Sequence, residues 1–104
     1  MNTVELLKAA KAVIEKEENW TQNAYARNAE GEKVAGDSSS AVCWCSLGAF
    51  DKVSQGAVNS TWTDAVGILS YVSGDSIATF NDSHTHAQVM VWWDEAIAEA
   101  ERRA

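Results

Sequence analysis

The sequence contains no proline, only two cysteines and only two histidines among its 104 residues. Two cysteines do not supply the four ligands of an ordinary structural zinc site or a framework of several disulfides. No apolar run reaches the roughly 20 residues that a membrane-spanning helix needs. Lys8 and Lys11 interrupt the apolar residues near the N-terminus, which is untypical of a signal peptide. We therefore expect a cytoplasmic protein without a membrane segment.

Basic residues are scarce over most of the chain. Residues 37–101 contain nine acidic residues and a single base, Lys52, and the net charge of the whole chain is −7. An acidic surface repels phosphate backbones, so we expect no direct contact with nucleic acid. The same charge would attract a partner protein with a basic surface.

The residues that are abundant indicate a packed domain. The hydrophobic share is 46% and includes five tryptophans, and no repeat or low-complexity stretch divides the chain. A chain of this length can bury roughly two-thirds of the surface that its unfolded form exposes. We predict a single domain over residues 1–104.

Apolar spacing and capping residues predict a mainly α fold, with about four helices on one core. Between the first two helices, residues 20–35 have few helix-stabilising features and a turn at Asn28–Gly31, so we expect a small β-hairpin or an extended arm there. Gly48 lies inside a nearly continuous apolar segment, where it would permit close approach of another backbone. Residues 76–80 are ambiguous. The first two predicted helices are Thr3–Glu18 and Ala41–Val53. The third runs from about Thr61, where Thr61 and Asp64 have the form of a helix start, to Val72, and Ser73-Gly74-Asp75 stops it. The last follows a Thr85/Gln88 capping box and runs to about Glu101.

Cys43 and Cys45 fall in the second predicted helix. Two positions apart on a helix, their side chains would lie about 200° from each other, so they could not bond together. We interpret them as small buried core residues. The alternative is a nucleophilic or redox thiol, which would require a nearby base and an electropositive setting.

Asp82, His84 and His86 form the one cluster with metal-ligating chemistry. In an extended segment these three side chains would lie on one side, and imidazoles with a carboxylate suit a divalent transition metal. The alternative is a loop before a helix, where polar residues serve as caps and histidine is solvated. The acidic residues of the last helix, Asp94, Glu95, Glu99 and Glu101, are interpreted as a solvated face.

A further set of polar and aromatic residues lies mostly in the segments between the predicted helices. It could form a structural network, for example with Arg27 paired to Asp82. Alternatively it could form a polar pocket, framed by Trp20 and Trp44, that binds a small ligand. The set consists of Trp20, Gln22, Tyr25, Arg27, Trp44, Asn81 and Asp82.

The same segments resemble a family of bacterial and phage proteins. The resemblance rests on Trp20-Thr21-Gln22 with Tyr25-Ala26-Arg27, on Trp44-Cys45 with Gly48-Ala49, and on Asn81-Asp82 with Thr85. It extends from the first helix to about Ile97. The family is a domain of unknown function, so the resemblance implies one intact domain and supplies no activity, cofactor or site.

No catalytic residue set is complete, because no nucleophile has a recognisable base and orienting group. No phosphate-binding glycine loop is present, so we expect no cofactor. The leading hypothesis is a small acidic, non-catalytic binding or accessory protein, associated with phage or a mobile element, that acts through a partner protein. The alternatives are a ligand-binding domain or enzyme using Gln22, Arg27, Asn81 and Asp82, and metal binding through Asp82, His84 and His86. Five tryptophans could leave an apolar patch exposed, through which two copies of the chain could form a homodimer.

Overall fold

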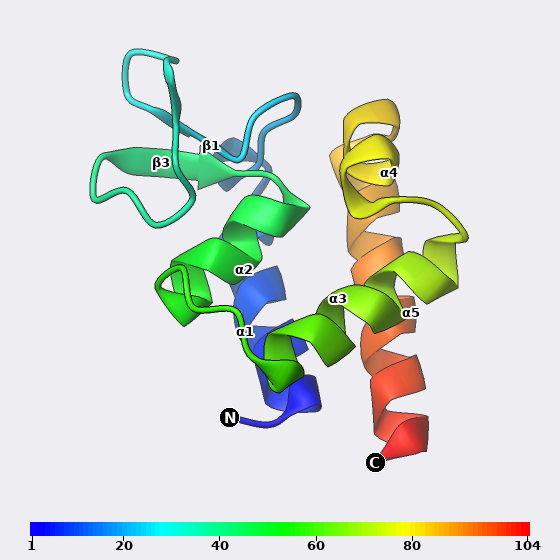
Figure 1. Cartoon of the computed structure of the whole chain (residues 1–104). Helices are drawn as coiled ribbons and strands as arrows, with labels where there is room; N and C mark the ends of the chain where they lie inside the picture. The colour runs from blue at the N-terminus through cyan, green and yellow to red at the C-terminus, as the bar shows by residue number, and fades with distance from the viewer.

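A computed structural model describes all residues from 1 to 104 and shows five α-helices around one core, with a small sheet at one end (Figure 1). The mainly α class with a small β element is confirmed, and the ambiguous segment after residue 76 supplies the fifth helix. The elements are α1 (Thr3–Ile14), the 3₁₀ turn η1 (Glu17–Asn19), β1 (Ala26–Asn28), β2 (Lys33–Val34), β3 (Ala41–Trp44), α2 (Ser46–Ser54), α3 (Ser60–Ser73), α4 (Ile77–Ser83) and α5 (His86–Arg103).

The first and last helices, α1 and α5, both begin with a capping box. The Asn2 side chain accepts from the backbone N–H of Glu5, and the Glu5 side chain accepts from that of Asn2. Thr85 and Gln88 make the same reciprocal pair at the start of α5. These bonds satisfy backbone donors that have no partner inside a helix. The first helix is shorter than predicted, because the chain leaves α1 at Ile14 and turns through η1 toward the sheet.

The sheet has three antiparallel strands in the order β2-β1-β3. The hairpin of β1 and β2 confirms the expectation for residues 20–35, but β3 occupies a segment that we predicted to be helical. Ala26 pairs with Val34 on one side and with Trp44 on the other. A lone two-stranded ribbon is only marginally stable, so pairing with a third strand outweighs the local helical pattern of residues 41–45.

Gly48, near the start of α2, contacts the sheet closely. A Cβ atom at this position would lie 1.8 Å from the carbonyl oxygen of Tyr25, far inside any permitted contact. The expectation that Gly48 admits a neighbouring backbone is confirmed. The absence of a side chain at this position sets the distance between α2 and the strand that begins at Ala26.

Helix α3 begins one residue before the predicted start, and its cap is Asn59 rather than Thr61. The Asn59 side chain accepts from the backbone N–H of Trp62. Its end at Gly74 is as expected, because Gly74 adopts the left-handed conformation that glycine tolerates best. Ser76 caps α4 in the same way as Asn59 caps α3.

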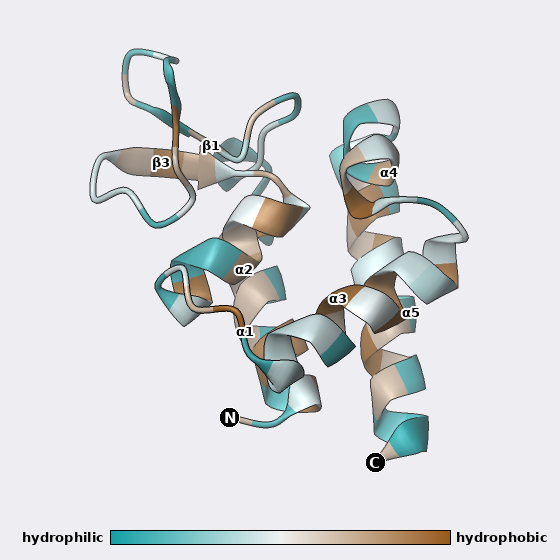
Figure 2. Ribbon diagram, in the orientation of Figure 1, coloured by the Kyte–Doolittle hydropathy of each residue, from teal (hydrophilic) through white to brown (hydrophobic).

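The core lies between α1, α2, α3 and α5, whose inner faces carry most of the apolar residues (Figure 2). Trp93 and Phe50 are its largest fully buried side chains, and their ring centroids lie 5.2 Å apart. Val91 points outward and is 56% exposed, as the helical spacing predicts. No helix is both long enough and apolar enough to cross a membrane.

Candidate functional site: a groove between the sheet and α4

Asn81 is the buried centre of the contact between the sheet and the helices. Its Oδ1 atom accepts from Trp20 Nε1 at 2.8 Å, from the backbone N–H of Ser46 at 3.1 Å and from the Ser46 hydroxyl at 2.9 Å. The Ser46 hydroxyl in turn accepts from Trp93 Nε1 at 3.1 Å. Asn81 and Ser46 are completely buried. Buried polar groups must be paired, and this network pairs residues from four separate segments.

Gln22 extends the same contact to the end of α4. Its side-chain amide donates to the carbonyl of Asn81 at 3.1 Å and to that of His84 at 2.9 Å. The last carbonyls of a helix have no partner within the helix. Gln22 therefore completes the C-terminal end of α4 from a distant segment.

Arg27 does not pair with Asp82, so the pairing predicted from the sequence is wrong. Its guanidinium donates to the Thr21 hydroxyl at 3.1 Å and to the carbonyls of Gly31 and Gln22 at 3.1 and 3.2 Å. These acceptors belong to the hairpin turn and to the segment before β1. Arg27 thus holds the hairpin to its own flanking chain.

Trp44 is also used inside the fold. Its indole N–H donates to the carbonyl of Gly36 at 2.9 Å, and Lys52 Nζ lies 5.8 Å from the ring centroid. Trp20 forms an isolated bridge with Trp44. The two tryptophans therefore brace the segments on either side of the sheet, and neither lines the groove described next.

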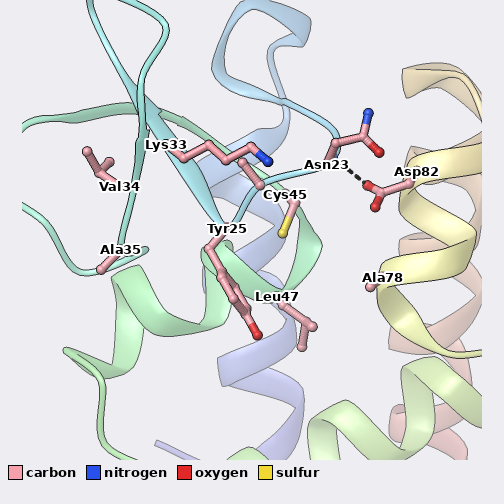
Figure 3. Close-up of a pocket in the computed structure, with 10 residues that line it drawn as sticks. Asn23, Tyr25, Lys33, Val34, Ala35, Cys45, Leu47, Ala78 and Asp82 are labelled. Carbon is pink, nitrogen blue, oxygen red and sulfur yellow. Dashed lines mark hydrogen bonds between the residues drawn. The ribbon is translucent and has the colours of Figure 1, made fainter.

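The groove lies between the hairpin and α4 and has a volume of about 740 Å³ (Figure 3). Leu47 and Cys45 line it from the start of α2, and Ala78 lines it from α4. Two charged residues line it as well: Lys33 on the hairpin and Asp82 on α4. Of the seven residues predicted for the polar site, Tyr25 and Asp82 line this groove. Its remaining lining residues are Asn23, Ala24, Val34 and Ala35.

Asp82 is held in place by one of its two carboxylate oxygens. Oδ1 accepts from the backbone N–H of Asn23 at 2.9 Å and from the side-chain amide of Asn81 at 3.1 Å. Asn23 adopts a left-handed conformation with φ of 63°, which asparagine tolerates better than most residues. No hydrogen bond of the structure uses Oδ2 of Asp82, so this oxygen is free to accept from a bound group.

The two cysteines lie in different elements, so the predicted placement of both on one helix is wrong. Cys43 is half-buried on β3, and its thiol lies 4.0 Å from the carbonyl of Arg27. Cys45 is buried and caps α2, with its sulfur 3.4 Å from the backbone nitrogen of Gly48. Burial raises the pKa of the Cys45 thiol, and the charge of Asp82 acts in the same direction. A thiol in this setting is a poor nucleophile.

The histidines do not join Asp82 in a metal-binding group. No three histidine, cysteine, aspartate or glutamate residues are grouped so that they could hold a metal. His84 stacks on Phe80 with ring centroids 3.7 Å apart, and its Nδ1 lies 2.8 Å from the Phe80 carbonyl. His86 Nε2 lies 2.8 Å from the carbonyl of Ile14. Each imidazole therefore bonds to a different part of the backbone.

Much of the acidic face of α5 is matched by bases. Glu99 binds Arg102 and Arg103, which lower the pKa of its carboxyl. Asp94 lies 2.7 Å from Lys11 and, through that hydrogen bond, raises the pKa of the lysine. Glu101 lies 3.9 Å from Lys8. The interpretation as a merely solvated face is thus incomplete, because α5 is tied to α1 by ion pairs at the surface.

Ser46 and most of the groove residues, among them Lys33 and Ala78, were not predicted as site residues from the sequence. Ser46 could have been noticed as the hydroxyl between a strand-like and a helical segment. Lys33 and Ala78 lie 45 positions apart in the sequence, and no local pattern connects them.

Comparison with known proteins identifies the family of this chain. A model for a family of unknown function, DUF6197, matches residues 1–99. The chain belongs to this family, and the expectation of a domain of unknown function is confirmed. No curated protein and no solved structure shows significant similarity to the chain.

Proposed function

We propose that this protein is a non-catalytic binding protein that acts through a partner protein, and that the groove between the hairpin and α4 is its contact site. The observation that carries the proposal is the composition of the groove. It combines an apolar lining with an ammonium group from Lys33 and a free carboxylate oxygen from Asp82. Apolar surface with a few placed polar groups is the usual composition of a recognition site.

The polar residues predicted for a small-ligand pocket are used in hydrogen bonds within the protein, which favours the groove as the binding site. Gln22, Arg27 and Asn81 donate to groups of the chain itself. Using them for a ligand would break these bonds, and a polar group that stays buried without its partner costs about 1–3 kcal/mol. We therefore do not propose a ligand pocket built on these three residues.

The charge of the protein favours a partner with a basic surface around the contact. The net charge is −7, and the acids of α5 that are paired with bases contribute little to the unbalanced part. Complementary charge raises the rate of association and suppresses wrong partners. Glu30 and Glu32, in the exposed turn of the hairpin, would face a partner that approaches from that side.

Affinity capture from a lysate of the source organism tests the proposal. The bait is compared with Ala78→Arg, which places a long cation in the groove at an exposed helical position. Val91→Arg is the matched control, because Val91 is exposed on α5 outside the groove. A partner identified by mass spectrometry should be retained by wild type and Val91→Arg and lost with Ala78→Arg. Retention by all three baits would contradict the proposed contact site.

A further inference from the structure

The groove is bordered by a free strand edge. Strand β2 lies at the edge of the sheet, with β1 as its single neighbour. The backbone N–H of Asn28 donates to the Glu32 carbonyl at 3.0 Å, and Arg27 is the partner of Lys33 in the register. In an antiparallel ladder, hydrogen-bonded pairs alternate with pairs whose backbone groups point outward. The N–H and C=O of Lys33 therefore point to the open edge, where another extended chain can pair with them.

The groove beside this edge has two opposite charges, and neither forms an ion pair within the protein. No ion pair of the structure involves Lys33 or Asp82. Figure 3 shows the Lys33 side chain reaching over the groove from the hairpin, while Asp82 lies on the side of α4. Leu47 lines the groove from the start of α2, beside Tyr25 in Figure 3, and is an apolar contact for an incoming side chain.

We propose that the groove binds an extended segment of the partner protein in which an apolar side chain is flanked by one acidic and one basic residue. The acidic residue pairs with Lys33, the basic residue pairs with the free oxygen of Asp82, and the apolar side chain packs on Leu47. The extended backbone pairs with the free edge at Lys33. This inference rests on the proposed function and adds the chemistry of the segment.

Selection from a displayed library of random twelve-residue peptides tests this specificity. Wild-type protein is the bait, and Ala78→Arg is used for counter-selection. The enriched peptides should share an apolar residue flanked by one acid and one base. Sequences without this combination, or no enrichment above the counter-selected background, would overturn the inference.

Affinities of one enriched synthetic peptide, measured by fluorescence anisotropy, then test each charge. Lys33→Met keeps the aliphatic stem, and Asp82→Asn keeps the oxygen that accepts from Asn23. Each substitution should weaken binding about two- to fivefold, the worth of a partly exposed ion pair. The matched controls Lys52→Met and Glu95→Gln, at exposed positions outside the groove, should leave the affinity unchanged. Thermal melting confirms that every variant is folded, and equal affinities for all of them would overturn the assignment of charges.

The two proposals fail differently. If Ala78→Arg abolishes partner capture but the peptides show no charge rule, the contact site stands and the segment chemistry is wrong. If Ala78→Arg leaves capture intact, the contact site is wrong, and the segment chemistry falls with it.

Discussion

Replacement of Asn81 by alanine should destabilise the whole domain, because one buried oxygen serves three donors. Asn81→Ala leaves Trp20 Nε1, the Ser46 N–H and the Ser46 hydroxyl without this acceptor. A buried donor left unpaired costs about 1–3 kcal/mol. The hydroxyl can rotate toward another acceptor, so two donors carry most of the penalty. We expect a loss of about 3–5 kcal/mol in the free energy of unfolding.

Urea denaturation followed by circular dichroism at 222 nm measures this loss. For a domain of this length it corresponds to a fall in Tm of roughly 10–30 °C. Asp82→Asn is the control on the same helix, because it keeps the acceptor oxygen Oδ1 and should cost less than about 1 kcal/mol. A loss below about 1 kcal/mol for Asn81→Ala would refute the view that this network holds the sheet to the helices.

Three further perturbations test separate parts of the structure. Gly48→Ala forces a Cβ atom onto the Tyr25 carbonyl and should lower the free energy of unfolding by about 3 kcal/mol or more. The control Gly67→Ala, with open space around it, should stabilise α3 by up to about 1 kcal/mol. Equal effects of the two substitutions in thermal melts would contradict the close approach. Burial raises the pKa of the Asp51 carboxyl above its usual 3.8. The folded state therefore binds the proton more tightly than the unfolded state, and the contribution of Asp51 to the stability of the protein falls as the pH rises through that range. Asp51→Asn should therefore raise Tm at pH 7, with a gain that shrinks toward pH 4, and a gain independent of pH would be the wrong result. The Cys45 thiol, in a variant whose other cysteine is replaced, should react with a disulfide reagent more than about tenfold more slowly in the folded than in the urea-unfolded protein, and similar rates would show that the thiol is accessible.

The parts of the fold that depend on local signals could be predicted from the sequence. Asn2 with Glu5 and Thr85 with Gln88 are three residues apart, and each pair interacts within one turn of its helix. The stop at Gly74 is equally local, because it depends on the left-handed backbone of one residue. Such features are independent of the rest of the chain.

Residues 41–45 form strand β3 and the cap of α2, and not the start of a helix as predicted, because of a partner that is distant in the sequence. Trp44 and its neighbours are apolar enough for a buried helix, but β1 required a partner at its second edge. The free-energy cost of leaving β1 unpaired depends on the assembled sheet, so it cannot be predicted from the residues of β3 alone. Asn59 replaced Thr61 as the cap of α3 for a local reason: both residues can cap, and the sequence did not rank them.

The candidate site was predicted in part. Asn81, Gln22 and Trp20 belong to one predicted set, and the structure joins them by direct hydrogen bonds. The expected partner of Arg27 was wrong, because its guanidinium donates instead to the carbonyls of Gly31 in the hairpin turn and of Gln22 before β1. The groove itself depends on contacts between the hairpin and α4, which no spacing in the sequence reveals.

Site-specific photocrosslinking tests whether the groove contacts a partner protein. Benzoylphenylalanine is placed at Tyr25 in the groove or at Val91 on α5, two positions that are each 56% exposed. Equal exposure gives both probes the same chance of random crosslinks. If the groove is the contact site, irradiation in cells of the source organism gives a discrete crosslinked partner from position 25 and none from position 91. Crosslinks from position 91 alone, or the same products from both positions, would contradict it.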